Sequence, residues 1–405
     1  MMKSFQDEKL TLRIQQQGLV YRLVEQFEEI SRIDLAKLSQ LAPATITSLT
    51  RELIDKKLLI EKAVRSTESR GRPAIGLSVS PFYWQSLSAI LTEDQFTIFL
   101  CELDGTLITK QFYSLEQVSF DQLDIFLKSY MEDFLSKNEV KMPHPIAFSI
   151  VVVGKLDEQN NLSKLGKADV DLNLQTLFKS FFKIPILIKE YFETWLLWES
   201  SLGTVIGYEN VLFLEIDDVI NLSILSNGKL FNPQNNYKIN VDLLQVPKFS
   251  PLQDQINLSL PDVERYQFKN QVSHQVIYEL IDLAYPDNGL KNNLNKFHFL
   301  SQKIKAGDEP AIEILELVVN ILAYIIMNLV KIFSSQRVML ISRLLENKNI
   351  FLNMINKTLI AYLNDPTSQV EVLTSRYEWN DPIVISASIK RGIYDGTLLK
   401  EVISN

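Results

Sequence analysis

The sequence predicts a small winged helix-turn-helix domain at residues 1–82, followed by a two-lobed α/β body. Residues 31–77 contain two short helical patterns and then two short strand patterns separated by a basic loop. After residue 79, apolar strands and helices alternate in two groups that each begin with a β-meander. The chain has 405 residues, 46% of them apolar, which is enough for two or three buried cores.

The domain begins with two helices. A supporting helix with one buried face is predicted by apolar residues at helical spacing: Ile14, Val20, Leu23, Val24 and Phe27. Ser31 is followed three residues later by Asp34, which is the form of a capping box. A second, short helix is therefore expected from Arg32 to about Ser39.

A third helix is expected after a tight turn at residues 40–42. Pro43 fits the first position of a helix, where the missing N–H costs nothing, so this helix should run to about Lys56. Ala36 and Ile46 fall where the second and third helices must cross closely. This crossing would leave the start of the third helix exposed, and such a helix can enter a DNA major groove.

Exposed side chains on this part of the domain are the candidate contacts to base edges and phosphates. They are Arg32, Ala44, Thr45, Thr47, Ser48 and Arg51. An ordinary three-helix bundle is the alternative interpretation of the same pattern.

Two strands and a basic strap complete the predicted domain. Residues 58–61 and 75–79 have strand patterns, and a basic polar stretch at 65–73 separates them. Its glycine permits a close backbone approach, and the following Pro73 favours extended geometry, so an arginine could enter a narrow minor groove. The candidate contacts of this strap are Arg70, Gly71 and Arg72. A solvated loop with scattered charges is the alternative.

Charge is divided in the way a DNA-binding domain requires. Residues 1–75 contain 13 Lys and Arg against 10 Asp and Glu, a net charge of +3, and the remaining residues contain 28 against 39, a net charge of −11. Because a charge of +3 is modest, a single copy should bind DNA weakly. We therefore expect a symmetric dimer or tetramer that presents two or more DNA-binding domains to a double-stranded operator.

The composition argues against a disulfide-bonded protein and against a membrane-spanning one. The single cysteine, Cys101, cannot form an intrachain disulfide, which fits a reducing cytoplasm. The most apolar stretch, Leu317–Val330, is shorter than the roughly 20 residues needed to span a bilayer, so we expect a buried core helix and no membrane insertion. The polar first residues contain no apolar signal segment.

The body is predicted as two lobes, residues 83–200 and 201–405. Asp104-Gly105 should form a hairpin turn in the first lobe, and Asn227-Gly228 in the second. The predicted strands of the first lobe are 86–91, 96–102, 107–112, 146–153 and 185–189, with a helix at 172–182. Those of the second lobe are 211–216, 221–225, 229–231, 338–341 and 369–373, with helices prevailing from about residue 274.

Several motifs resemble repressors of the ROK family (repressors, open reading frames and kinases), and most closely the N-acetylglucosamine and xylose repressor type. The resemblance is specific over residues 20–80 and weaker to the C-terminus. Its motifs are Ile30–Ile33, Ser39–Thr47, Thr50–Ile54, Gly71–Ile75, Leu225–Gly228 and Lys390–Gly392. It implies an actin-like, ribonuclease H-like body of the sugar-kinase type, which in repressors senses a sugar or a transporter and forms oligomers.

The sequence departs from the kinases of that family at the catalytic positions. Residues 90–94, at the first phosphate turn, contain two acids and no glycine, so ATP should not bind there. Tyr191 stands where the resemblance places the aspartate that acts as general base, and a phenol with a pKa near ~10 is poorly suited to that role. Glu190 is adjacent but should point to the opposite face of its strand.

The family's other polar positions are also eroded. Residues 217–221 replace the second glycine-rich turn, and the sugar-gripping glutamate and histidine align with Asn240 and Leu243, which leaves Asn221 and Asn240 as weak ligand candidates. The absence of any cysteine after Cys101 excludes the family's thiolate zinc site, so neither a metal nor another cofactor is expected. The three histidines, His144, His274 and His298, are too scattered to suggest a site.

Two further features have a structural and a functional interpretation. Asp217 and Asp218 are adjacent acids, which form a solvated turn more often than a catalytic dyad. Four aromatic residues at helical spacing favour a helix packed into the core, with a ligand platform as the alternative. They are Tyr191, Phe192, Trp195 and Trp198.

These observations favour a sequence-specific transcriptional regulator without kinase activity. The resemblance implies a repressor of genes for the uptake or breakdown of amino sugars or related sugars, controlled by a sugar phosphate or a protein partner. The alternative is a ROK-type sugar kinase with an added DNA-binding domain.

Overall fold

The computed structural model describes residues 11–63, 75–166, 168–216, 220–231, 238–287, 289–290, 293–342, 346–365 and 369–404. The chain forms two compact units. Unit 1 comprises Met1–Trp198 and Tyr377–Asn405, and unit 2 comprises Glu199–Arg376. The sequence places residues 377–405 in the second lobe, but the structure assigns this segment to unit 1.

The amino-terminal domain of unit 1 combines three helices with a small antiparallel sheet of strand order β1-β3-β2. Its elements are α1 (Leu12–Phe27), β1 (Ile30–Ser31), α2 (Arg32–Ser39), α3 (Pro43–Asp55), β2 (Leu59–Ala63) and β3 (Ile75–Val79). The three predicted helices and two predicted strands are present, and β1 is an additional strand. Ile46, Leu49 and Leu53 of α3 are fully buried, as the expected helix crossing requires.

The first lobe of unit 1 is built on a five-stranded mixed sheet of order β11-β7-β4-β5-β6. Its strands are β4 (Gln85–Leu91), β5 (Gln95–Glu102), β6 (Leu107–Ser114), β7 (Pro145–Val152) and β11 (Ile186–Glu190). A second sheet consists of β8 (Gly154–Leu156), β9 (Leu162–Leu165) and β10 (Ala168–Leu172). Gly105 has φ +95° in the predicted turn between β5 and β6.

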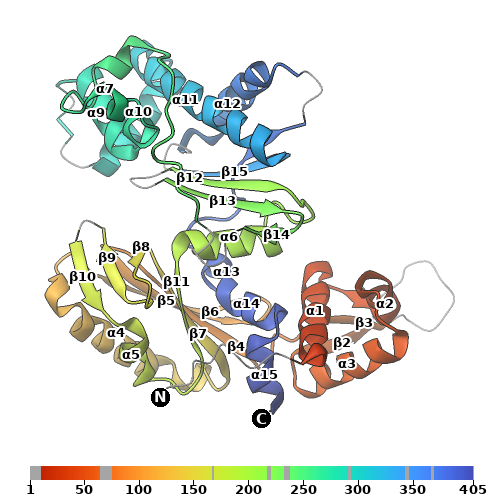
Figure 1. The fold of residues 1–405 in the computed structure, drawn as a ribbon. Helices are drawn as coiled ribbons and strands as arrows, with labels where there is room; N and C mark the ends of the chain where they lie inside the picture. Colours follow the sequence, from red (N-terminus) through yellow and green to blue (C-terminus); the bar gives the residue numbers. More distant parts are fainter. Residues whose placement is uncertain are drawn as a thin grey trace. The chain divides into compact units, whose positions relative to one another are not determined.

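Both faces of this main sheet are covered by helices. One face packs on α4 (Leu123–Asn138) and α5 (Leu174–Lys179), with fully buried Phe148 and Phe178 in the shared core. The other face packs on the C-terminal helices α13 (Pro382–Ile385), α14 (Ala387–Tyr394) and α15 (Thr397–Ser404) (Figure 1). Strands buried on both faces need cover on both, and this explains why the chain returns to unit 1 at its end.

Helix α6 (Tyr191–Ser201) follows β11 directly. Its four aromatic residues are 8% exposed or less, so the prediction of a helix packed into core is confirmed. Cys101 is buried in β5, and burial, the largest cause, raises the pKa of its thiol to about 12.

Unit 2 has a second five-stranded sheet, of order β14-β13-β12-β15-β16. Its strands are β12 (Val211–Ile216), β13 (Ile220–Ser226), β14 (Lys229–Leu230), β15 (Arg337–Ser342) and β16 (Glu371–Leu373). Its helices are α7 (Asp262–Arg265), α8 (Lys269–Val272), α9 (His274–Ala284), α10 (Asn293–Lys305), α11 (Glu309–Phe333) and α12 (Lys348–Leu363). Short 3-10 helices occur at Phe120–Gln122, Glu139–Lys141 and Pro251–Asp254.

Helix α11 is the centre of the unit 2 core. Among the described residues it is long and apolar enough to cross a membrane by length and composition. Most of its side chains pack instead against the sheet and the neighbouring helices, including Val318 and Leu322, which are fully buried. The predicted buried core helix is therefore present, and it is longer than the apolar stretch that predicts it.

Candidate DNA interface

Helices α2 and α3 are joined by a short turn that local chemistry determines. The Ser31 hydroxyl accepts a hydrogen bond from the Asp34 backbone N–H at 3.1 Å and donates to the Asp34 carboxylate at 2.7 Å, so it caps the start of α2. This hydroxyl also lowers the pKa of Asp34. Gln40 ends α2 in the left-handed conformation, and Pro43 begins α3 after three turn residues.

The open face of α3 presents polar and cationic side chains. Ala44, Thr47 and Arg51 are exposed, and their spacing of three and four residues places them on one side of the helix. The Thr47 hydroxyl donates to the Pro43 carbonyl at 2.9 Å, and its oxygen can still accept a further hydrogen bond. Arg51 forms no hydrogen bond or ion pair with any described residue. Thr45 is half-buried at the edge of this face.

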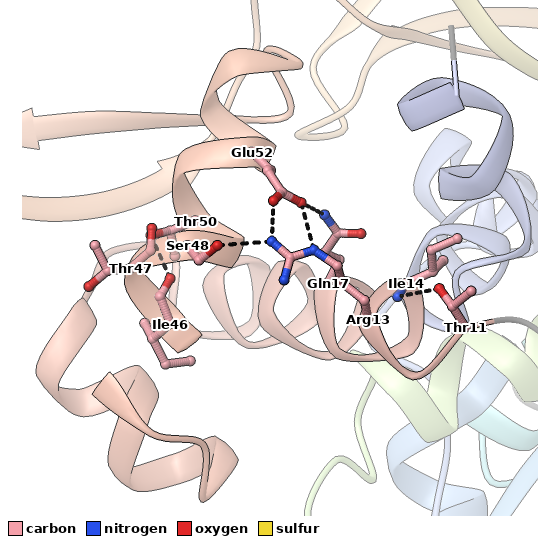
Figure 2. Close-up of polar contacts among 9 residues, drawn as sticks. All are labelled: Thr11, Arg13, Ile14, Gln17, Ile46, Thr47, Ser48, Thr50 and Glu52. Atoms are coloured by element: carbon pink, nitrogen blue, oxygen red, sulfur yellow. Dashed lines mark hydrogen bonds and ion pairs between the residues drawn. The ribbon is translucent and has the colours of Figure 1, made fainter. Parts of the chain in front are cut away.

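Ser48 lies on a different side of α3 from its neighbour Thr47. Its hydroxyl accepts a hydrogen bond from the Arg13 guanidinium of α1 at 2.9 Å, as Figure 2 shows. Arg13 also pairs with Glu52, which in turn accepts from the Gln17 amide at 2.7 Å. The sequence predicts Ser48 on the exposed face, but the structure shows it half-buried among the hydrogen bonds that link α1 and α3.

Arg32 likewise has partners inside the domain. Its Nε donates to the Thr50 hydroxyl at 2.9 Å, and its Nη2 pairs with Glu61 of β2 at 2.6 Å. The side chain is 28% exposed. The structure thus shows Arg32 linking α2, α3 and β2, a role that the sequence pattern did not indicate.

The predicted basic strap, with Arg70, Gly71 and Arg72, lies outside the described residues. The strands on either side of it are present, because β2 ends at Ala63 and β3 begins at Ile75. Lys62 on β2 is exposed, and it is a candidate phosphate contact that the sequence analysis does not include. Its place in a strand next to the basic stretch in the sequence could have indicated it.

Helix α1 anchors this domain to the C-terminal helices through a buried polar cluster. The Lys390 ammonium of α14 pairs with Glu25 of α1 and donates to the Leu103 carbonyl. The side chains of Lys390 and Glu25 are only 5% and 12% exposed. The Tyr394 hydroxyl donates to the other oxygen of Glu25 at 2.7 Å. Burial first, and then the charge of Glu25, raises the pKa of Tyr394 well above its usual value.

The backbones of α1 and α14 approach so closely that the contact requires glycine. A Cβ atom on Gly18 would lie 2.2 Å from the Tyr394 carbonyl oxygen. Gly396 has φ +89°, and a Cβ there would lie 2.6 Å from Ile14. Sequence analysis predicts one buried face for α1, whereas the structure buries two, one toward α3 and one toward α14.

An aromatic cluster fastens the end of this domain to the first lobe. The Trp84 indole N–H donates to the Lys56 carbonyl at 2.8 Å. The Lys57 ammonium lies 4.0 Å from the centre of the Tyr83 ring, which stacks on His144 at 3.9 Å. His144 therefore packs against the aromatic rings of this cluster.

At residues 92–94, where the family resemblance places the first phosphate turn, the side chains make local contacts. The Thr92 hydroxyl donates to the Asp94 carboxylate, and Glu93 lies so close to Gly166 that a Cβ there would meet it at 1.8 Å. Glu190 is buried and accepts a hydrogen bond from the Leu156 backbone N–H at 3.0 Å. Tyr191 is 8% exposed, with its ring 6.5 Å from that of Trp379.

The weak ligand candidates of unit 2 make local contacts. The Asn221 amide donates to Glu215 on the neighbouring strand at 2.5 Å, and the Asn240 side chain accepts from the Asp242 backbone N–H at 2.9 Å. Asp217 and Asp218 lie outside the described residues. Across the described ranges, no group of three His, Cys, Asp or Glu side chains is placed to hold a metal ion.

Relatives of this chain include DNA-binding transcriptional regulators. It is 27% identical over 237 residues to the DNA-binding transcriptional repressor Mlc of Escherichia coli K12, which covers 57% of this chain and 58% of Mlc. It is 23% identical over 389 residues to the DNA-binding transcriptional dual regulator NagC of the same strain, 95% of both chains. The xylose repressor of Staphylococcus xylosus is 25% identical over 66% of this chain and 75% of its own.

The chain is a homologue of the ROK-family repressors. A crystal structure of a ROK family transcriptional regulator, homologous to Mlc, superposes with a TM-score of 0.77 at 23% identity and covers 97% of this chain and all of that one. A ROK hexokinase from Thermus thermophilus superposes with a TM-score of 0.56 at 14% identity, over 76% of this chain and 97% of its own. These matches confirm the expected actin-like α/β body. No family model matches the sequence.

Proposed function

We propose that this protein is a sequence-specific transcriptional regulator whose amino-terminal domain is a winged helix-turn-helix. The observation that carries the proposal is the open face of α3, where Thr47 is exposed and Arg51 has no partner among the described residues. Helix α3 would enter a major groove, with Thr47 near base edges and Arg51 near phosphate. The 389-residue alignment with NagC supports the same function over nearly the whole chain.

The wing would add a minor-groove contact. Residues 64–74 contain the Arg70-Gly71-Arg72 strap, whose arginine we place in the narrow groove beside the α3 contact. Arg72→Ala is then expected to weaken operator binding and to reduce its dependence on salt, because the variant has no cation to insert into the groove. Unchanged affinity at fixed salt would exclude this part of the proposal.

A homodimer or homotetramer is the form we expect to act on the operator in the cytoplasm. A net charge of +3 on residues 1–75 provides few phosphate contacts per copy. Two copies related by symmetry would place their α3 helices in successive major grooves, about 34 Å apart on B-form DNA. Relatives of the chain are named as N-acetylglucosamine and xylose repressors, so we propose genes for the uptake or breakdown of amino sugars or related sugars as targets. We propose a sugar phosphate or a protein partner as the effector.

Kinase activity is the alternative function, because ROK sugar kinases share the fold of the body. We propose that this chain has no such activity. The acids of the turn at 92–94 would repel a phosphate, and the carboxylate of Glu190 is occupied by the Leu156 N–H. Tyr191 offers a phenol where a carboxylate base is required.

Two measurements on the full chain test the proposal together. Footprinting of genomic fragments bound by the purified protein should recover a small set of sites with two related half-sites. A coupled assay with ATP and a panel of hexoses and hexosamines should show no phosphorylation. Failure to select any fragment would refute the regulator, and turnover of ATP that depends on the sugar would establish the alternative.

A further inference from the structure

A cavity of about 390 Å³ lies within unit 2, beside the edge strand β16. Three cationic side chains from three different segments line it: Arg337 of β15, Lys348 at the start of α12, and Arg376 after β16. One carboxylate, that of Glu371, lines it as well. The cavity therefore carries an excess of positive charge in a part of the chain that is acidic as a whole.

The three cations differ in how they are held. Arg337 is fixed, because it donates to the Gln369 carbonyl at 2.7 Å, lies 3.7 Å from Glu371, and has its guanidinium 4.7 Å from the centre of the Tyr208 ring. Lys348 and Arg376 form no ion pair with the described residues. Lys348 donates to the Ser375 carbonyl at 3.0 Å. Two cations are therefore left without a charged partner in the described part of the chain.

The remaining wall of the cavity suits a ligand with a phosphate and a small organic body. Helix α12 begins at Lys348 without a side-chain cap, so its first N–H groups add partial positive charge there. The Thr374 hydroxyl is a further hydrogen-bonding group. Leu352, Leu373 and the Tyr208 ring provide apolar surface. A phosphate monoester carries about −1.5 to −2 charges near neutral pH, which matches two unpaired cations.

We propose that this cavity binds a phosphate monoester of a small metabolite, with the phosphate between Lys348 and Arg376 and the organic body against Leu352 and Leu373. The site shares no residue with the turn at 92–94, with Glu190 and Tyr191, or with the Asn221 and Asn240 positions. It is therefore separate from the sugar and nucleotide positions that the resemblance implies. The proposal does not depend on DNA recognition, and it rests on the proposed function only in giving a location to the sugar-phosphate effector named there.

Two residues that line the cavity, Thr204 and Arg376, belong to the first and last segments of unit 2. The Glu199 carboxylate, at the first residue of unit 2, accepts from the Thr204 N–H at 2.7 Å and from the Ser375 hydroxyl. The Thr204 hydroxyl accepts from the backbone N–H of Arg376, the last residue of unit 2, at 3.3 Å. A ligand that binds the folded protein through Arg376 and Lys348 should raise its melting temperature.

Isothermal titration and thermal melting of the full chain test the site. The probes are inorganic phosphate, glucose 6-phosphate and glucosamine 6-phosphate, with unphosphorylated glucose and gluconate as comparisons. We expect a phosphate ester to bind saturably and more tightly than inorganic phosphate, with no binding of the unphosphorylated sugar. Binding of gluconate alone, of inorganic phosphate alone, or of none of these probes would overturn the proposal.

Variants locate the binding. Lys348→Met and Arg376→Gln should each weaken the ester by about tenfold or more, since each removes a charge-assisted hydrogen bond. The matched control is Lys357→Met, an exposed lysine on the same helix that does not line the cavity, and it should bind as the wild type does. Equal affinity in Lys348→Met, Arg376→Gln and the wild type would place the ligand elsewhere and refute the site. Melting without ligand checks that each variant is folded.

Discussion

Two helical faces of the amino-terminal domain differ in whether their charged side chains are paired within the chain. On the α1 face, the carboxylate of Glu25 is buried and accepts from both Lys390 and Tyr394. On the α3 face, Arg51 is exposed and has no partner among the described residues. A buried charge is stable only when it is paired, whereas an exposed and unpaired cation remains available to another molecule.

This difference separates a permanent packing contact from a recognition surface. The α1 contact with α14 satisfies its charges within the chain, and the glycines at 18 and 396 allow the close approach. The α3 face leaves Thr47 and Arg51 to solvent, while Ser48 on the adjoining side is turned to Arg13. Substitutions on the first face should therefore change stability, and substitutions on the second should change DNA binding.

The largest effect is expected from Lys390→Met. It leaves the buried carboxylate of Glu25 without its cation, and breaking such a pair from one side costs about 3 to 5 kcal/mol. Thermal and chemical unfolding would measure the decrease in stability. The double variant Glu25→Gln, Lys390→Met should recover much of it, because no charge is then buried. A Lys390→Met protein as stable as the wild type would contradict the importance of this pair.

Tyr394→Phe should have the next largest effect, with a characteristic pH dependence. It removes a hydrogen bond to a carboxylate, which contributes about 1.5 to 3 kcal/mol. Because the folded pKa of Tyr394 is raised, the stability linked to its protonated form is complete below the unfolded pKa of about 10 and is lost as pH rises through the folded value. Between pH 8 and 11, the melting temperature of the variant should therefore fall less steeply than that of the wild type. If the two curves of melting temperature against pH are parallel, Tyr394 does not cause this pH dependence.

Gly18→Ala reverses the usual sign of a helical substitution. Alanine in place of glycine inside a helix is normally favourable by about 1 kcal/mol. Here the added methyl would meet the Tyr394 carbonyl, so we expect a net destabilisation of about 1 to 3 kcal/mol. Chemical unfolding of this variant, compared with Gln15→Ala at an exposed position of the same helix, would measure the loss of stability. A Gly18→Ala protein as stable as the wild type would contradict the close contact with Tyr394.

The adjacent hydroxyl residues Thr47 and Ser48 distinguish the two faces directly. Thr47→Ala should change the preference among operator sequences by about 1 to 3 kcal/mol if the side chain reaches a base edge. Ser48→Ala removes the acceptor for Arg13, so it should lower stability by about 1 kcal/mol and leave sequence preference unchanged. Competition binding with operator and random DNA separates the effects, and equal behaviour of the two variants would refute the distinction.

The smallest expected effect is that of Arg51→Gln. Removal of this cation should weaken binding to operator and random DNA alike, and should reduce the slope of log affinity against log salt by about 1 for each phosphate that is no longer neutralised. Arg391→Gln is the matched control, since that arginine is exposed on α14 and lies 3.8 Å from Asp395. A salt slope unchanged from the wild type would show that Arg51 does not bind phosphate.

Local elements were predictable because their causes lie within one turn of the chain. The Ser31 cap, Pro43 at the start of α3, and the Asp104-Gly105 turn are each encoded by neighbouring residues, and all three are found where expected. The strands of both main sheets were predictable for the same reason. The long helix α4 and the strands β8 to β10 were not predicted, because their apolar periodicity is weak.

The partners of charged side chains were not predictable in the same way. Arg32 and Ser48 both carry groups suited to DNA contact, and nothing near them in the sequence indicates Glu61 or Arg13 as a partner. Such pairs depend on how separate elements pack, so a sequence pattern can predict an exposed face of a helix but not which polar groups on it remain free. Arg51 remains available because it forms no ion pair with an acid among the described residues of the folded domain.

The order of helices and strands, the division of charge, and the absence of glycine at residues 90–94 follow from the amino-acid sequence alone, because these properties reside in single residues and short spacings. The return of residues 377–405 to unit 1, and the pairing of Glu25 with Lys390, 365 positions away, are properties of the tertiary structure. The physical reason is that the main sheet of unit 1 must be covered on both faces, and the segment that covers the second face comes from the far end of the chain.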